Sequence, residues 1–423
     1  MQRYAWLLIT WILGQNTLAQ STLPDSTFFV RTQGPLAYLN YGTGEDRLGG
    51  AKMSYLDSLV LLKVIGKHKD LYRVRLTNGL SAWIPQNLTR SDTNVRPPYQ
   101  YLTTSWRVYG DDRYDYVSIP LPERLPYRSW QEINPSRIVV DIFGATANSN
   151  WLTQLRSAQE IAHVDYEQVA DEQFRVTIHL RHAQHWGYGI GYEGRRLVIR
   201  VVRQPASLRL RDLTVAIDAG HGGSNLGARG LRSKVLEKDL NLSIVQYLRQ
   251  ELESKGARVI LTRTKDTLVG NNDRLLSLRA LRPDLLISIH NNAAGDTLRV
   301  RGTSTYYKHL GFRPLSQAIL TRLLDLSLVE YGNVGRFNFT LNAPTEYPNV
   351  LVEGLFMSHP ADEALLLQAD FQKQMARQIR RGVEDWLKTV MARAIFRPLR
   401  YSNLCGGRSL LLGLCGFCPR QNT

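Results

Sequence analysis

Cysteine is scarce in this sequence and is confined to one end of it. The 423 residues contain only three cysteines, Cys405, Cys415 and Cys418. The rest of the chain therefore cannot form disulfide bonds, and its stability must come from packing. Cys415 and Cys418 have the spacing of half a zinc ribbon, but one further cysteine does not complete the four ligands of a structural zinc site. We therefore interpret residues 391–423 as a basic tail that holds no such site.

Long apolar runs are also missing. After residues 5–13, no stretch approaches the roughly 20 apolar residues that a membrane-spanning helix needs. Hydrophobic residues make up 43% of the chain and charged residues 21%, which excludes both a multi-span membrane protein and a disordered polyelectrolyte. At roughly 150 residues per domain, the length predicts about three folded domains.

The charge is basic but not concentrated. Lysine and arginine number 53 against 37 acidic residues, a net charge of +16. A dedicated nucleic-acid surface would gather this excess into one patch, whereas here it is spread along the chain. We therefore expect no nucleic-acid partner. A dispersed positive charge is better suited to a polyanionic surface.

The N-terminus has the three parts of an export signal. Arg3 is the positive residue, residues 5–13 (AWLLITWIL) form a short apolar run, and residues 17–19 (TLA) offer small residues for cleavage. This pattern predicts a signal peptide over residues 1–19 and no membrane span after its removal. The alternative is an ordinary first strand or core helix. No cysteine lies near the cut, so a lipid anchor is not indicated.

Residues 27–90 have the pattern of a small β domain. Alternating apolar residues at 72–76 precede Thr77-Asn78-Gly79, a hairpin turn signal, and a second short strand begins at residue 82. Together with the apolar run 59–65, this segment resembles a bacterial SH3-like domain, although an unspecified small barrel fits it nearly as well. Consecutive prolines at 97 and 98 then indicate a linker.

A second β-rich segment follows the linker. Residues 138–143, 175–180 and 197–202 are strands by composition or alternation. The segment resembles the AMIN-type β-sandwich domains that precede cell-wall amidases. His182 and His185 lie three residues apart in it, but without a nearby third ligand we expect them to be surface polar residues and not metal ligands.

From residue 213 onward, strands and helices alternate, which predicts a mostly parallel sheet covered by helices. Residues 214–218 form a strand before a glycine-rich loop. Leu240, Ile244, Leu248 and Leu252 fall on one face of a helix. Further strands are expected at 258–262, 284–289, 304–307 and 349–352, and further helices at 316–324 and 370–388.

Polar side chains follow three of these strands. They are His221, His290 and Glu353. A fourth, Glu237, opens the long helix, where the helix macrodipole favours a carboxylate. Because ligands bind beyond the carboxyl ends of parallel strands, these residues can meet at one sheet edge. Two histidines and one carboxylate with an open fourth position would form a catalytic zinc set.

Each of these residues also has an ordinary explanation. A strand-end histidine is often only hydrogen-bonded, and a first-turn glutamate often only stabilises its helix. A glycine-rich loop can instead hold a phosphate, but Asn225 replaces the third glycine of a dinucleotide fingerprint, and no Lys-Ser or Lys-Thr pair follows. Four such placements at one sheet edge are improbable by chance, so the metal interpretation is favoured.

These motifs carry a family resemblance. Residues 212–389 resemble the zinc-dependent N-acetylmuramoyl-L-alanine amidases of the Amidase_3 class. The matching segments are Ile217 to Gly223, Gly227-Ala228, Gly230, Glu237-Lys238, Thr262-Arg263, Arg274, Ser288 to Ala293, Leu351 to Glu353 and Phe356 to Ser358. The sequence departs from the family pattern at Asn225, at Leu278-Arg279 and at His359, which questions substrate contacts more than metal binding.

The resemblance implies the site and the reaction. His221, Glu237 and His290 would bind one zinc ion, and Glu353 would be the catalytic carboxylate. The bond cleaved would be the amide between N-acetylmuramic acid and L-alanine in peptidoglycan. Some members carry an inserted helix that blocks the site, but the short segment between His290 and residues 304–307 leaves no room for one. His359 could contact the stem peptide, but an ordinary surface histidine explains this position at least as well.

Two rival functions remain open. A zinc peptidase acting within stem peptides uses similar chemistry, and a non-catalytic wall-binding protein would rely on the β-rich segments alone. The predicted fold is an α/β catalytic domain with a mostly parallel sheet, preceded by two small β-rich domains. The expected divisions are a signal peptide (1–19), an SH3-like domain (20–96), an AMIN-like domain (97–207), the catalytic domain (208–390) and a basic tail (391–423). We expect an exported monomer of the periplasm or cell envelope whose partner is peptidoglycan; the sequence does not tell whether an activator protein exists.

Overall fold

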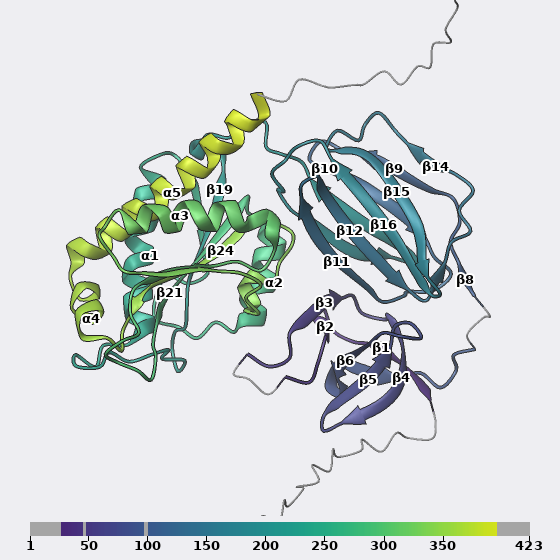
Figure 1. The fold of residues 1–423 in the computed structure, drawn as a ribbon, viewed down its shortest axis with the longest axis horizontal. Coiled ribbons are helices and arrows are strands. Elements are labelled where there is room, and N and C mark those ends of the chain that lie inside the picture. The colour runs from purple at the N-terminus through teal and green to yellow at the C-terminus, as the bar shows by residue number, and fades with distance from the viewer. Residues whose placement is uncertain (1–26, 45–47, 97–99, 396–423) are drawn as a thin grey trace, which may run out of the picture.

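The computed structural model describes residues 27–44, 48–96 and 100–395. The predicted signal peptide, the prolines of the linker and residues 396–423 of the predicted tail lie outside the described residues. The described chain forms three parts: an N-terminal β part, a β-sandwich and a C-terminal α/β part (Figure 1). No described helix combines the length and the apolar character needed to cross a membrane.

The N-terminal part is a seven-stranded antiparallel sheet in the order β3-β2-β6-β5-β4-β1-β7. Its strands are β1 (Phe28–Thr32), β2 (Ala37–Asn40), β3 (Lys52–Leu56), β4 (Leu61–His68), β5 (Leu71–Arg75), β6 (Ser81–Pro85) and β7 (Thr89–Ser91), with a 3-10 turn at Gln86–Leu88. The hairpin predicted around residues 77–79 is confirmed, since β5 and β6 pair across it. In β6 every second residue is buried, which is the pattern of a strand with one covered face.

The second part packs two antiparallel-rich sheets face to face. One sheet has the order β14-β9-β10-β18-β17 and the other β11-β12-β16-β15. The strands are β8 (Tyr101–Leu102), β9 (Trp106–Gly110), β10 (Tyr114–Pro120), β11 (Tyr127–Ile133), β12 (Ser136–Phe143), β13 (Ala145–Thr146), β14 (Leu152–Gln154), β15 (Ile161–Ala170), β16 (Gln173–Leu180), β17 (Tyr188–Glu193) and β18 (Arg196–Val202). The predicted strands at 138–143, 175–180 and 197–202 are confirmed within β12, β16 and β18.

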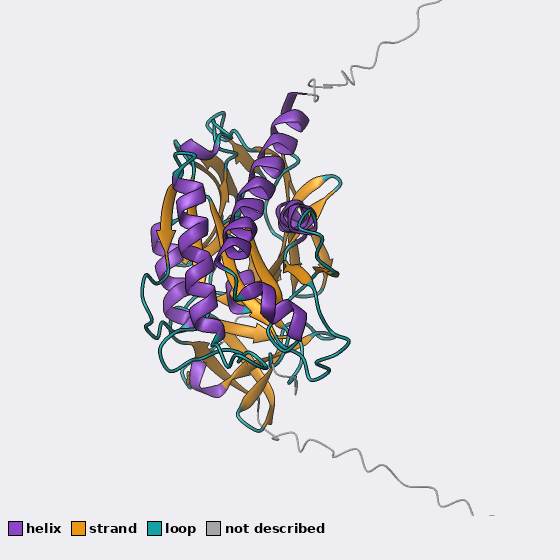
Figure 2. Cartoon of the chain, turned by 90° about the vertical axis from the view of Figure 1, so that its left-hand side faces the viewer, coloured by secondary structure: helices purple, strands orange, loops and turns teal. Residues whose placement is uncertain are grey.

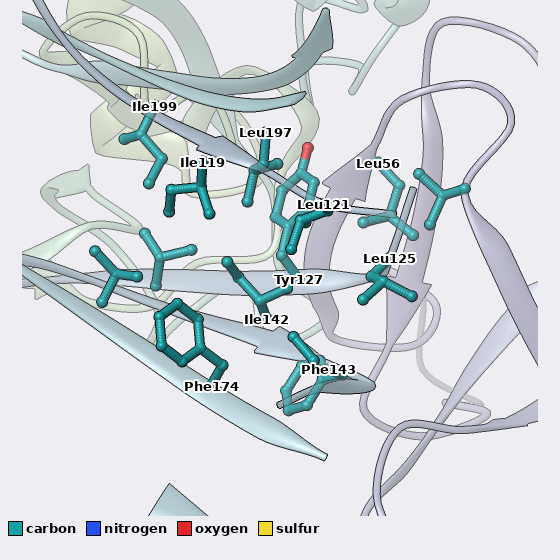
Figure 3. Close-up of a cluster of buried hydrophobic side chains, with 14 of the residues drawn as sticks. Leu56, Ile119, Leu121, Leu125, Tyr127, Ile142, Phe143, Phe174, Leu197 and Ile199 are labelled. Carbon is teal, nitrogen blue, oxygen red and sulfur yellow. The ribbon is translucent and has the colours of Figure 1, made fainter. Parts of the chain in front are cut away.

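The core of this sandwich lies between its sheets (Figure 3). Ile119 and Ile199 of one sheet face Ile142 and Phe174 of the other, and all four are fully buried. Leu56 of β3 reaches the same cluster from the N-terminal part. The two β parts therefore share apolar contacts in addition to the covalent connection.

The C-terminal part has a mixed six-stranded sheet in the order β20-β19-β21-β24-β22-β23. Its strands are β19 (Thr214–Ala219), β20 (Arg258–Leu261), β21 (Leu285–Asn292), β22 (Thr303–Tyr306), β23 (Glu330–Val334) and β24 (Asn349–Phe356). Only the β22–β24 pair is antiparallel among the pairs described for this sheet.

Helices cover both faces of this sheet. They are α1 (Glu237–Glu253), α2 (Asn271–Leu281), α3 (Arg313–Leu324), α4 (Pro360–Leu366) and α5 (Ala369–Ile395), with 3-10 turns at Leu210–Asp212, Leu310–Phe312 and Thr340–Asn342. Figure 2 shows the long helices in front of the strands; α5 packs on both α1 and α3. Val215 and Ile217 of β19 point into that core, whereas Ala216 joins the smaller cluster on the α2 side. Burial on both faces explains the apolar runs of β19 and β21.

Strands β21 and β24 and the last helix end later than the sequence predicted. Strands β21 and β24 continue past residues 289 and 352, so His290 and Glu353 lie inside strands and not beyond them. The continued pairing of β21 with β24, up to Asn292 with Phe356, keeps these polar residues in the ladder. The last helix continues to Ile395, beyond the predicted domain end at residue 390.

Candidate metal centre

His221 sits in the glycine-rich loop that follows β19. Its backbone has a φ of 63°, a left-handed conformation that is uncommon for a residue with a side chain. The guanidinium of Arg274 donates to the His221 carbonyl oxygen (2.6 Å), and that of Arg263 donates to the Gly220 carbonyl oxygen (3.1 Å). Two buried arginines therefore hold the loop backbone in this conformation.

Glu237 lies at the centre of the cluster. It is the first residue of α1, as predicted. Its Oε1 lies 3.1 Å from Nε2 of His221 and 3.1 Å from Nδ1 of His290. Its Oε2 accepts a hydrogen bond from the Ala228 amide (2.8 Å). The loop, the helix and β21 thus bring the three predicted ligands together, with one potential ligand atom of each within 4.8 Å of the others.

The electrostatics of the cluster favour an ionised carboxylate. Burial alone would raise the pKa of Glu237, but hydrogen bonds and charge from His221 and His290 outweigh it and hold the pKa well below its usual value. Burial lowers the pKa of His221, but the hydrogen bond and the charge of Glu237 raise it further than burial lowers it. Glu237 is therefore held in its ionised form between His221 and His290.

Several features fit a metal ion at this position. The Nδ1–H of His221 donates to Oδ1 of Asn225 (2.9 Å), which leaves Nε2 facing Glu237 as the ligand nitrogen. Nε2 of His290 is buried and has no hydrogen-bond partner among the described residues. A donor set of two imidazoles and one carboxylate is the chemistry that zinc accepts.

Two glycines make room for the cluster. A Cβ on Gly220 would lie 2.2 Å from the His290 ring, and a Cβ on Gly227 would lie 2.5 Å from Oε2 of Glu237. Gly227 also has a φ of 68°, which favours glycine. The ligand side chains therefore occupy space that only glycine leaves open.

Glu353 lies beside this cluster. It is in register with His290 of β21 on one side and with Ser304 of β22 on the other. Paired residues of neighbouring strands point to the same face of a sheet, so Glu353 and His290 share a face. Burial raises the pKa of Tyr306 to about 12, and the nearby charge of Glu353 contributes to the shift.

Two neighbours of the cluster were not singled out from the sequence. The amide of Asn241 donates to Oε1 of Glu237 (3.2 Å) and to the Gly220 carbonyl oxygen (3.2 Å). Its place one helical turn after Glu237 is the signal that could have identified it. The ring of Phe339 packs edge-on against His290, with 5.4 Å between centroids. No local pattern around residue 339 indicates that contact.

Comparisons with known proteins identify two regions. Residues 215–385 match the family model described as N-acetylmuramoyl-L-alanine amidase, and residues 106–201, from β9 to β18, match the AMIN domain. The catalytic domain of CwlV from Bacillus (Paenibacillus) polymyxa var. colistinus is 30% identical, and the match covers 42% of this chain and 98% of that chain, with a TM-score of 0.40. AmiC2 of Nostoc punctiforme, an N-acetylmuramoyl-L-alanine amidase, is 32% identical over 42% of this chain and 97% of that one, with a TM-score of 0.39.

Residues 215–385 belong to the N-acetylmuramoyl-L-alanine amidase family. The predicted family and the AMIN-like region are both confirmed. Among curated relatives, the probable cell wall amidase LytH of Staphylococcus aureus is 33% identical over 181 residues, which are 42% of this chain and 58% of LytH. The chain thus matches little more than half the length of that amidase.

The departures from the amidase pattern have clear positions in the structure. Asn225 contacts His221 directly, so this departure concerns a predicted metal ligand more than a substrate contact. Arg279 pairs with Glu346 (2.7 Å) and lies over the ring of Tyr55 in the N-terminal part, away from the cluster. His359 caps α4 through Nδ1, which accepts from the Ala361 amide (3.3 Å).

His359 and His185, for which a surface position was considered, are buried, whereas His182 keeps 37% of its side chain exposed. His359 is buried, because its ring closes the first turn of α4. His185 is also buried, and its Nε2 donates to the Glu132 carbonyl oxygen (2.8 Å). His182 is partly covered and pairs with Glu160 (2.6 Å). The sandwich and the α/β part pack against each other around His185, which lies next to Gly311, and a sequence pattern does not encode such a contact.

Proposed function

We propose that this chain is a zinc-dependent amidase that hydrolyses the amide bond between N-acetylmuramic acid and L-alanine in peptidoglycan. The observation that carries the proposal is the convergence of His221, Glu237 and His290 within 4.8 Å. The match of residues 215–385 to the N-acetylmuramoyl-L-alanine amidase family supports this choice of bond. The name of LytH, a cell wall amidase, supports the cell wall as the place of action.

In this proposal, His221, Glu237 and His290 hold one zinc ion. A bound zinc ion lowers the pKa of its water and polarises the amide carbonyl of a substrate. The chain prepares the ligands for that ion: Asn225 orients His221, and hydrogen bonds from Ala228 and Asn241 fix Glu237. Such partners keep ligand atoms in place before the metal arrives.

We assign the proton transfers to Glu353. Its carboxylate would accept a proton from the attacking water and deliver it to the nitrogen of the departing L-alanine. The register of Glu353 with His290 supports this role, because it places a carboxylate on the face of the sheet that carries the ligand. Because Glu353 lies within β24 and pairs with both neighbouring strands, its backbone is held in place.

Access to the site does not require removal of a helix in this proposal. The described segment between β21 and β22, residues 293–302, consists of turns and irregular backbone and contains no helix. The side chain of His221 keeps 23% of its surface exposed, whereas that of Glu237 keeps 6%. A substrate can therefore approach from the side of the His221 loop, and we propose that the enzyme is active without an activator.

We also propose roles for the remaining parts of the chain. Residues 1–19 would direct export and be removed, which places the enzyme in the cell envelope. Residues 20–96 would be an SH3-like domain, and this domain and the AMIN domain would hold the enzyme on peptidoglycan. The catalytic domain would span residues 208–390, the tail would be dispensable, and the enzyme would act as a monomer.

Digestion of purified peptidoglycan tests the function. The proposal predicts new free amino groups on L-alanine, identified by mass spectrometry of the released peptides. A new terminus at any other residue of the stem peptide would assign the chain to the peptidases instead. Binding without any release would leave a wall-binding protein, and either result would refute the amidase proposal.

A further inference from the structure

A second group of metal-ligating side chains lies on the β-sandwich, outside the α/β part. Nε2 of His179 is 2.9 Å from Oδ2 of Asp165, and Nε2 of His163 is 3.5 Å from the same oxygen. The two imidazole rings stack, with 3.9 Å between centroids and 14° between planes. One potential ligand atom of each residue lies within 4.8 Å of the others.

The strands themselves produce this arrangement. His163 of β15 is directly opposite His179 of β16, and Asp165 follows two residues later on the same face of β15. A register shift between Ile161 and His163 interrupts the regular ladder just before the group. Such irregularities re-aim side chains at sheet edges. Because β15 is the last strand of its sheet, the group ties an edge strand to its neighbour.

We propose that His163, Asp165 and His179 bind a divalent transition-metal ion of the zinc class. Two imidazole nitrogens and one carboxylate oxygen suit such an ion better than they suit calcium or magnesium. The side chains of His163 and Asp165 are 59% and 65% exposed and that of His179 is 19% exposed, so water can complete the coordination. The ion would fasten β15 to β16 and stabilise the folded sandwich by mass action.

Metal analysis of the untagged full-length chain tests this site, because a histidine tag would itself bind zinc. After equilibrium dialysis against Zn²⁺, we expect two equivalents per chain. The double variant His163→Ala/His179→Ala should bind one equivalent and hydrolyse peptidoglycan as the wild type does. His182→Ala, which changes a histidine of the same sandwich outside the group, should still bind two.

A stability measurement keeps the test valid if the double variant folds poorly. In a chain that carries His221→Ala and His290→Ala, Zn²⁺ should still raise the melting temperature, and adding the single exposed substitution His163→Ala should abolish that rise. The proposal would be overturned if the wild type and His163→Ala/His179→Ala each bound one equivalent of zinc. It would also be overturned if adding His163→Ala left the zinc-induced rise in melting temperature unchanged. If the wild type bound no zinc at His221 and His290, that result would count against the amidase proposal alone.

Discussion

Asp218 and Arg274 form a buried ion pair beneath the loop that carries His221. Their side chains are 1% and 2% exposed. The same guanidinium also donates to the carbonyl oxygens of Ala219 (2.7 Å) and His221 (2.6 Å). The ion pair therefore connects the end of β19, the loop and helix α2, and it fixes the backbone of a proposed zinc ligand.

Replacing Asp218 by Asn should destabilise the protein and weaken metal binding. Asn keeps the shape but leaves the Arg274 charge buried without its counter-charge, and breaking a buried pair in this way costs about 3–5 kcal/mol. The free energy of unfolding in urea and the zinc affinity would be measured. Asp385→Asn is the matched control, because Asp385 pairs with Arg322 at the surface, where a pair contributes about 0–1 kcal/mol. Equal losses in both variants would refute the structural role given to Asp218.

Removal of the metal should abolish hydrolysis. A chelator is expected to stop the release of L-alanine termini, and added zinc should restore it, because the proposed water activation depends on the ion. His221→Ala/His290→Ala should lose one equivalent of zinc together with activity. Full activity of the chelated protein would contradict the ligand assignment.

Glu353→Gln should separate catalysis from metal binding. Gln keeps the size of the side chain but cannot accept the proton, and loss of general-base assistance lowers the rate by about 10² to 10⁴. Glu353→Gln should therefore retain zinc and bind peptidoglycan while releasing almost no product. Glu237→Gln, the control at a proposed ligand, should lose zinc affinity as well. Turnover by Glu353→Gln near the wild-type rate would mean that another group accepts the proton.

Much of the candidate centre was predictable because its residues follow recognisable local signals. The apolar segments at 214–218 and 284–289 and the start of a helix at Glu237 were correctly predicted. Parallel pairing of β19 with β21 then brings the His221 loop next to His290. The exact ends of the strands were not predictable, because they depend on pairing with neighbours and not on composition.

The contacts that cross from one element to another were out of reach. Phe339 lies far from His290 in sequence but packs against its ring, and His185 is buried where the sandwich meets Gly311 of the α/β part. The pair of His163 with His179 depends on the register of β15 against β16, which includes an irregularity. A shift of one residue would place these side chains on opposite faces, and the sequence contains no signal for that register.

Gly220→Ala should damage the candidate metal centre without changing a ligand. The added Cβ would lie 2.2 Å from the His290 ring, so the ring or the loop must move. We expect weaker zinc binding and a large loss of activity. Gly79→Ala is the control, since a Cβ there meets nothing within 4 Å. If Gly220→Ala binds zinc as tightly as the wild type, the close approach of Gly220 to His290 is not a requirement of the site.

Acid should destabilise the contact between the sandwich and the α/β part through His185. Burial lowers the pKa of His185 to about 4, although its hydrogen bond to the Glu132 carbonyl oxygen opposes the shift. The unfolded chain therefore binds a proton below about pH 6.5 that the folded chain binds only near pH 4. The stability that His185 contributes is complete above pH 6.5 and falls by roughly 3 kcal/mol as the pH drops through this window.

Urea unfolding between pH 4 and 7.5 measures this effect. The variant His185→Gln should lose stability less steeply toward acid than the wild type, because glutamine does not titrate. His182→Gln should lose stability more steeply toward acid than the wild type. The hydrogen bond to Glu160 raises the pKa of His182 despite burial, so His182 contributes stability that is complete below pH 6.5 and is lost as the pH rises through its folded pKa. A wild-type slope in His185→Gln would show that its imidazole is not the group that resists protonation in the folded protein.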